Sequence, residues 1–224
     1  MKNPKPLLGL LQRRELVVPT WKGWLALLLT ISIIGITVAR NAYDFLAVHD
    51  PQPGEILVIE GWSPEFTIAA GLAEYQGTKY QELIVTGGPI EIGNSLIAYK
   101  TYAEVGTAVL TKWGVPPELI HTVPAPPVER DRSYASGVAV RKWLNERGLK
   151  PAKINVIGNG SHARRTRLVY QMAFGGETKV GINTSPEKDF DPRRWWTTSQ
   201  GFKAIMGEII AYTYTRLFFS PPKQ

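Results

Sequence analysis

A glycine turn followed by cationic side chains makes residues 153–167 (KINVIGNGSHARRTR) the stretch with the clearest candidate chemistry. The apolar run 154–157 predicts a buried strand, and the turn 158–160 breaks it. Ser161 is a suitable N-cap for a helix that begins at His162. A strand, a glycine turn and a helix N-terminus together present backbone N–H groups to an anion.

Arginines open this predicted helix, where the macrodipole disfavours positive charge. Cationic residues in the first turn of a helix, where they are unfavourable, are typical of functional sites. The sequence therefore predicts a site for a phosphate-like or carboxylate group, with the alternative that the helix start is solvated and His162 packs locally. The predicted anion-binding residues here are Asn159, Gly160, Ser161, His162, Arg164 and Arg165.

Alternating strands and helices are expected to position this stretch. Short apolar runs predict strands at 56–59, 83–85, about 119–123, 154–157 and 179–182, with helical sequence between them. This order predicts an α/β fold, a Rossmann-like three-layer sandwich with a mainly parallel sheet of about five strands. A last helix, about 198–219, is expected to pack on the sheet.

Glycine turns end three of the predicted strands. In parallel sheets ligands bind at the carboxyl ends of strands, and glycine allows the backbone to approach a ligand closely. We therefore expect the three turns to meet at one cleft. Besides the turn at 158–160, they contribute Glu60, Gly61, Thr86, Gly87 and Gly88.

Two glutamates are candidate acid–base groups, with His162 as the third candidate catalytic residue. Glu60 ends a buried strand, where desolvation would raise its pKa, although a structural carboxylate is an equal alternative. Glu104 follows Thr101 at capping-box spacing, which explains it without catalysis. Asp131 and Arg132 join the predicted ligand site. The alternative for Asp131 is that it caps the following helix, a position that Ser133 could also take.

The positive charge of the chain is concentrated at its start. The first 22 residues hold five of the 26 lysines and arginines against one glutamate, so the rest is nearly balanced despite the net charge of +7. This excludes a basic face for nucleic acid. There is no cysteine, and the three histidines lack ligand spacing, so no metal site is expected and the cofactor is unknown.

Residues 23–39 form a charge-free stretch of seventeen residues, near the minimum that crosses a bilayer. Trp21 and Trp24 flank it as interfacial anchors, and the positive-inside rule places residues 1–22 in the cytoplasm. The alternative is a signal peptide cleaved after Ala39. The predicted organisation is a basic N-terminus (1–22), a transmembrane anchor (23–39), a spacer (40–54) and an extracytoplasmic domain (55–220).

The ordered motifs resemble the SanA/YdcF/ElyC-like family. They are an apolar strand with a glycine turn, a Thr-Gly-Gly turn, an acidic residue opening the next helix, Gly-Val-Pro, and a late strand before His-x-x-Arg. Here they fall on 56–61, 86–88, Glu104, 114–116, and His162 with Arg165. The sequence departs from the family at Ala135 and Ser136, where glutamate and asparagine are usual.

The resemblance implies a Rossmann-like domain, often membrane-anchored, with a role in cell-envelope and peptidoglycan assembly. Two functions follow as expectations. One is an enzyme acting on a lipid-linked or phosphate-containing envelope precursor at the bacterial inner membrane, with envelope-assembly proteins as partners. The other is a non-catalytic binding or regulatory module that uses the same pocket.

Overall fold

Five parallel strands form the central sheet of the domain, in the order β3-β2-β1-β4-β5. The computed structural model describes residues 17–52, 54–91 and 98–222. The strands are β1 (Ile56–Glu60), β2 (Glu82–Gly87), β3 (Ile120–Pro124), β4 (Lys153–Asn159) and β5 (Lys179–Ser185). The continuous aliphatic runs of β1 and β2 are buried on both faces, as in a sheet covered by helices. The predicted α/β, Rossmann-like fold is confirmed.

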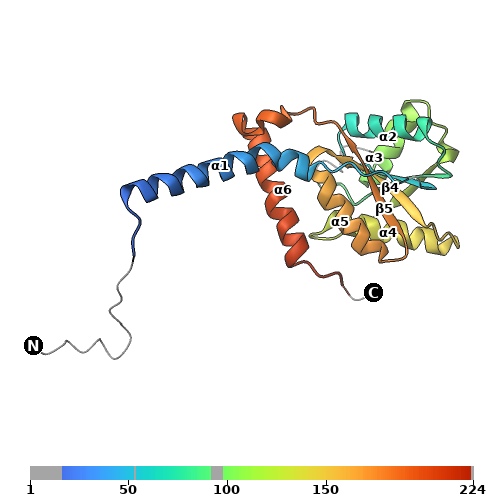
Figure 1. Cartoon of the computed structure of the whole chain (residues 1–224). Coiled ribbons are helices and arrows are strands. Elements are labelled where there is room, and N and C mark those ends of the chain that lie inside the picture. Colours follow the sequence, from blue (N-terminus) through green and yellow to red (C-terminus); the bar gives the residue numbers. More distant parts are fainter. Residues whose placement is uncertain (1–16, 53, 92–97, 223–224) are drawn as a thin grey trace, which may run out of the picture. The chain divides into compact units, whose positions relative to one another are not determined.

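Helices cover both faces of the sheet (Figure 1). One face packs against α2 (Glu65–Gly77) and α3 (Tyr102–Lys112), and the other packs against α4 (Arg132–Glu146) and α5 (Ala163–Phe174). Alternation along β1 sends Leu57 and Ile59 to the first core. It sends Ile56 and Val58 to the second core, and with them Glu60 to the α5 side.

The chain divides into two compact units, Met1–Ala39 and Arg40–Gln224. Helix α1 (Trp21–Leu46) begins in the first unit and ends in the second, and it is long and apolar enough to cross a membrane. Most of the predicted basic N-terminus, residues 1–16, lies outside the described residues. The predicted spacer 40–54 begins instead as the last turns of α1, where Leu46 is fully buried in the domain.

The rest of this predicted spacer follows the outer edge of β5. Asp50 and Ile182 exchange backbone hydrogen bonds in an antiparallel bridge. Thr184 donates its backbone N–H to His49 Nδ1 and its hydroxyl to the Val48 carbonyl. These contacts provide hydrogen-bond partners for backbone groups of β5 that face away from β4. The segment 48–52 therefore belongs to the domain.

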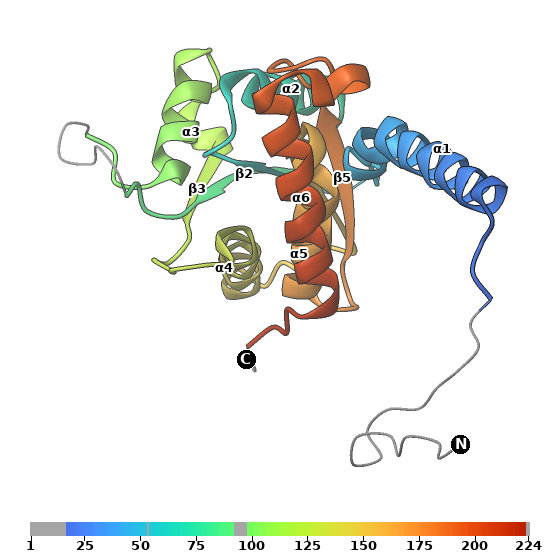
Figure 2. The same ribbon diagram turned by 90° about the vertical axis from the view of Figure 1, so that its left-hand side faces the viewer.

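The last helix, α6 (Ser199–Leu217), corrects another expectation. It packs on α5 and on the turn η3 (Gly160–His162), and not on the sheet, because α5 already covers that face (Figure 2). The short helix η4 (Pro192–Thr197) precedes it. The consequence for the site is direct, because α6 brings a carboxylate to the start of α5.

Helix starts differ from the predictions in detail. Ser161 lies in η3, and α5 begins at Ala163 without a side-chain cap. Asp131 occupies the predicted N-cap position of α4 in a left-handed conformation (φ 60°), and its side chain makes no capping bond. Helix α3 begins at Tyr102, after a loop whose residues 92–97 lie outside the described part.

Replacing Gly61 by alanine is expected to destabilise the domain by about 3 kcal/mol. A Cβ at this position would lie 2.0 Å from the Tyr102 carbonyl oxygen, which is backbone and cannot yield cheaply. Chemical denaturation measures the loss. Gly77→Ala is the control, because a Cβ there meets nothing within 4 Å, and it should leave stability unchanged or raise it by about 0.5 kcal/mol. Equal effects from the two variants would contradict the prediction.

Candidate functional site

A cleft of about 650 Å³ opens at the carboxyl ends of the strands. The loop after β1 contributes Trp62, and the loop after β2 contributes Gly88. The segment between β3 and α4 supplies one wall, and His162 and Arg165 supply another. Three of the predicted strand ends therefore contribute to one cleft, as parallel topology requires.

Glu208 of α6 reaches the two predicted cationic residues. Its Oε1 lies 2.9 Å from His162 Nδ1, and Arg165 donates to both of its oxygens, from Nε at 2.9 Å and from Nη2 at 3.0 Å. A bidentate guanidinium–carboxylate pair of this kind has a fixed geometry. The predicted cationic site is thus already neutralised by a carboxylate of the chain.

The electrostatics of Glu208 follow from these partners. Burial raises the pKa of this carboxyl, but the hydrogen bonds and charges of His162 and Arg165 outweigh burial and bring the pKa down to about 2. The carboxylate is therefore ionised at neutral pH. His162 Nδ1 also lies 2.9 Å from Arg165 Nη2, so the three side chains form one cluster. A guanidinium only donates and a carboxylate only accepts, so the tautomer of His162 decides which of its two Nδ1 contacts is the hydrogen bond.

Glu60 is a second carboxyl beside this pair, with an exposed fraction of 1 %. Burial raises its pKa, and His162, Ser133, Trp62 and Arg165 oppose that effect only in part. The carboxyl ends β1 next to Thr86 of β2, its partner in the strand register. Glu60 is thus a buried group that favours its neutral form.

Five buried polar atoms in the described residues make no hydrogen bond: Glu60 Oε1, Thr86 Oγ1, His162 Nε2, Thr166 Oγ1 and Tyr170 OH. Thr166 and Tyr170 lie four residues apart on α5, and His162 lies four residues before Thr166, at the end of η3. Glu60 and Thr86 are register partners near the carboxyl ends of β1 and β2. Burial raises the pKa of Tyr170, and the nearby Glu60 raises it further. Buried polar atoms without partners are uncommon, and each of them needs an explanation.

Several predicted site residues meet at the cleft. Asp131 and Arg132 line it with Gly88, His162 and Arg165. Glu60 lies behind the lining, in contact with its neighbours Trp62 and Ser133. The left-handed backbone of Asp131 is tolerated by this residue type and is the only positive φ outside glycine among the described residues.

Other predicted residues do not meet the cleft. The guanidinium of Arg164 lies over the Phe45 ring, 4.1 Å from its centroid. Asn159 and Ser161 line a smaller neighbouring cavity of about 300 Å³, and Asn159 accepts a hydrogen bond from Thr67.

The glycines of these turns serve packing of the chain on itself. A Cβ at Gly61 or Gly87 would collide with Tyr102, and one at Gly160 would meet Glu187. Thr86 is fully buried between the strands and the helices. Gly61, Thr86, Gly87 and Gly160 therefore support the cleft from behind and do not line it.

Glu104 is a capping residue. Its Oε2 accepts the backbone N–H groups of Lys100 at 2.6 Å and Thr101 at 3.0 Å, while Thr101 Oγ1 accepts the Glu104 N–H. These bonds lower the pKa of Glu104. The capping box, which was the alternative to a catalytic role, explains the position of Glu104. Glu104 does not line the cleft.

Glu104→Gln is expected to leave ligand binding and turnover unchanged, because glutamine also completes a capping box. Thr101→Ala should cost about 1 kcal/mol of stability through the lost cap. Thermal unfolding and binding isotherms measure the two effects. Loss of ligand affinity in Glu104→Gln would contradict a purely structural role.

Sequence reasoning missed Glu208, Trp62, Ser133 and Tyr170 as parts of the site. The ring of Trp62 packs edge-on against the His162 imidazole at 5.1 Å between centroids. One signal was available for Glu208, a single acid within an otherwise apolar helical stripe. Comparison of the sequence with protein-family models gives no match, and comparison with curated proteins gives none either.

Proposed function

We propose that this chain is a single-pass protein of the bacterial inner membrane that acts in cell-envelope biogenesis. Its domain would face the outside of the membrane and take a phosphate-containing envelope precursor, of the peptidoglycan or lipid-carrier kind, into the cleft. The charge-free stretch with its basic flank supports the membrane anchor. The ordered motifs from 56 to 165 support the envelope role.

The pairing of His162 with Glu208 beside the buried Glu60 is the observation that carries an enzymatic function. A carboxylate that orients an imidazole is a recurrent arrangement for general acid–base catalysis. In hydrolysis of a phosphate ester or pyrophosphate, water attacks phosphorus and the bond to the leaving oxygen breaks. His162 would take the proton of the attacking water or give one to the leaving oxygen, and Glu60 would supply or store that proton.

The phosphate itself would be bound differently from the sequence prediction. Arg165 is engaged with Glu208, so its charge is offset within the protein. Arg130 and Arg132 also line the cleft, and Arg132 is exposed, with only a long contact of 3.4 Å to Glu91. These two arginines at the cleft entrance are the groups we propose for the phosphate oxygens.

A non-catalytic ligand-binding or regulatory module is the second candidate. It is favoured by the pairing of the Arg165 charge with Glu208 and by the position of Glu60 behind the cleft lining. Such a site would recognise a ligand without converting it.

One comparison separates the two candidates. The full chain, reconstituted in lipid, would be incubated with undecaprenyl-linked phosphates and pyrophosphates, with product analysis beside binding isotherms. Product formation that requires His162 supports the enzyme. Saturable binding without product supports the module. Absence of both would overturn the proposal that the cleft takes such precursors.

A further inference from the structure

Helix α6 exposes a row of large apolar side chains on the side away from the domain. The side packed on the domain holds Glu208 and Thr215, together with the fully buried Ile205. The opposite side, which we call the outer face of α6, is mainly apolar and also holds Lys203. Its apolar residues, with Phe218 directly after the helix, are Phe202, Met206, Ile210, Tyr214, Leu217 and Phe218.

The outer face is open to its surroundings. Ile210, Leu217 and Phe218 have exposed fractions of 66, 67 and 71 %. At 100° per residue these side chains fall within one broad stripe, centred opposite Ile205 and Glu208. An apolar stripe of this length on a soluble protein marks an interaction surface.

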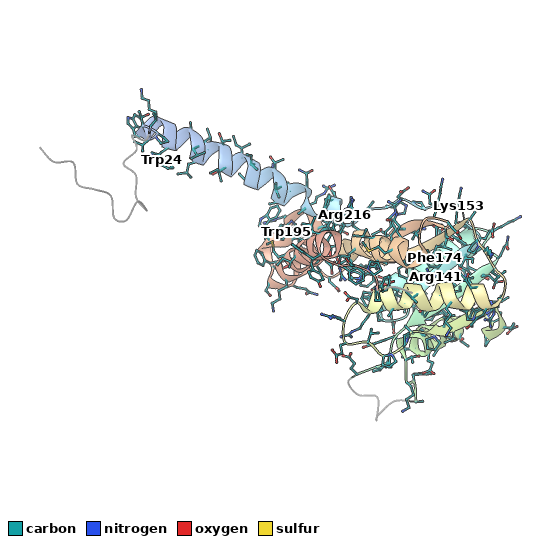
Figure 3. All side chains as sticks on the ribbon, turned by 90° about the horizontal axis from the view of Figure 1, so that it is seen from below. Trp24, Arg141, Lys153, Phe174, Trp195 and Arg216 are labelled. Atoms are coloured by element: carbon teal, nitrogen blue, oxygen red, sulfur yellow. The ribbon has the colours of Figure 1, made fainter. Side chains whose placement is uncertain are left out.

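Lysine and arginine outnumber acidic residues around the outer face, although Glu187 and Asp189 line a cavity together with Lys203. Glu208 is the only acidic residue of α6, and it is turned inward to its two partners. Lys203 and Arg216 are exposed on the same helix. In η4, Arg193 and Arg194 are exposed, as is Trp196. Figure 3 labels Trp195 of η4 and Arg216 of α6. Aromatic and aliphatic side chains flanked by lysine and arginine are the composition of helices that lie on anionic bilayers.

The proposed membrane anchor ends shortly before the residues of α1 that contact α6. The charge-free stretch ends at Ala39, and the helix continues without a break to Leu46. Phe45 packs against Tyr212 of α6, with 5.6 Å between ring centroids. Phe45 comes six positions after Ala39 in the chain. The element that carries the outer face is therefore tied to the end of the apolar stretch by a short helical connection.

We propose that the outer face of α6 lies on the surface of an anionic lipid bilayer. This inference rests on the proposed function, because it takes α1 as the membrane anchor. A second copy of the chain is a less suitable occupant, since face-to-face pairing would bring the lysines and arginines of two copies together. The docked helix would hold the domain against the headgroups.

The absence of cysteine permits a direct test in the full chain. Single cysteines at Leu28, Leu217 and Lys142 would carry a nitroxide label, in vesicles of phosphatidylcholine alone or in an equimolar mixture with phosphatidylglycerol. Collisions with oxygen report lipid exposure, and collisions with a water-soluble nickel chelate report water exposure. Leu28 tests the anchor, Leu217 tests the outer face, and Lys142 on α4 is the exposed control.

The expected result is that oxygen collisions exceed nickel collisions at Leu28 in both vesicles and at Leu217 in the mixed vesicles only. The label at Lys142 should show the reverse in both. Lys203→Gln and Arg216→Gln should each lower the docked-to-undocked ratio at Leu217 about fivefold. None of the labelled positions is buried, so the substitutions do not depend on repacking of the core.

Each contrary outcome identifies what is wrong. A water-exposed label at Leu217 with a lipid-exposed label at Leu28 overturns the docking and leaves the anchor intact. A water-exposed label at Leu28 overturns the anchor, and the docking with it. Dipolar broadening between Leu217 labels of two copies, independent of lipid charge, would assign the outer face to self-association and overturn the proposal.

Discussion

Glu208→Gln is expected to lower the free energy of unfolding by about 3 kcal/mol at neutral pH. The substitution removes a carboxylate that is 17 % exposed and leaves the Arg165 guanidinium, 25 % exposed, without its counter-charge. Breaking a largely buried ion pair by removing one partner is costly, because the remaining charge stays desolvated. Equilibrium denaturation of the two proteins measures the difference.

The difference should depend on pH in a defined direction. The pKa of Glu208 falls from 4.5 to about 2 in the folded protein. A lowered pKa means that the carboxylate stabilises the fold fully above its unfolded value. The stabilisation is then lost as the pH falls from about 4.5 towards 2. The stability curves of Glu208→Gln and the parent should therefore converge on acidification.

A surface glutamate provides the matched control for this experiment. Glu146 on α4 approaches Lys142 at 3.9 Å, and both side chains are more than half exposed. Glu146→Gln should change stability by less than about 0.5 kcal/mol at any pH, because solvent screens such pairs. If Glu208→Gln behaves like this control, the His162–Arg165–Glu208 cluster does not stabilise the fold.

The second large effect concerns turnover. If the cleft is catalytic, His162→Gln should lower turnover at least about a hundredfold, the usual contribution of general acid–base catalysis. Substrate affinity should change little, because the proposed phosphate contacts come from Arg130 and Arg132. Steady-state rates and binding isotherms on the same preparations separate the two quantities. Equal turnover in the variant would exclude His162 as the acid–base group.

Glu60→Gln is the companion variant. Glutamine matches the shape of a neutral carboxyl but cannot store or release a proton, so turnover should fall while affinity is kept. Stability gives an independent readout. The pKa of Glu60 is raised by burial, so the folded protein loses stability as the pH rises through that raised pKa. Glu60→Gln should therefore be more stable than the parent at alkaline pH. A variant less stable at every pH would contradict this account of Glu60.

The fold could be predicted because its signals are local. Aliphatic runs such as 56–59 and 83–85 are typical of strands buried on both faces, in a parallel sheet with helices on each side. The observed strands extend a few residues beyond the predicted runs, into polar ends such as Glu60 and Asn159. Hydrophobicity alone does not indicate those ends, because they are defined by pairing with neighbouring strands.

The site was predicted only in part, because its charges are balanced over long sequence distances. His162 and Arg165 stand out locally, but Glu208 lies 43 residues beyond Arg165 and in a different helix. Nothing near Arg164 in sequence indicates that its side chain packs on Phe45. Glycines at the strand ends also have two explanations, ligand approach and chain packing, and only the position of Tyr102 decides between them.

The segment alongside β5 bears on how a soluble fragment should be produced. A fragment that begins at Glu55, the predicted domain start, would lose the Asp50–Ile182 bridge and the contacts of Thr184. The bared strand would then offer its backbone to the same strand of another molecule, which is a route to aggregates. A fragment that begins at Arg40 keeps this cover and the buried Leu46, and it is the form that we expect to remain monodisperse.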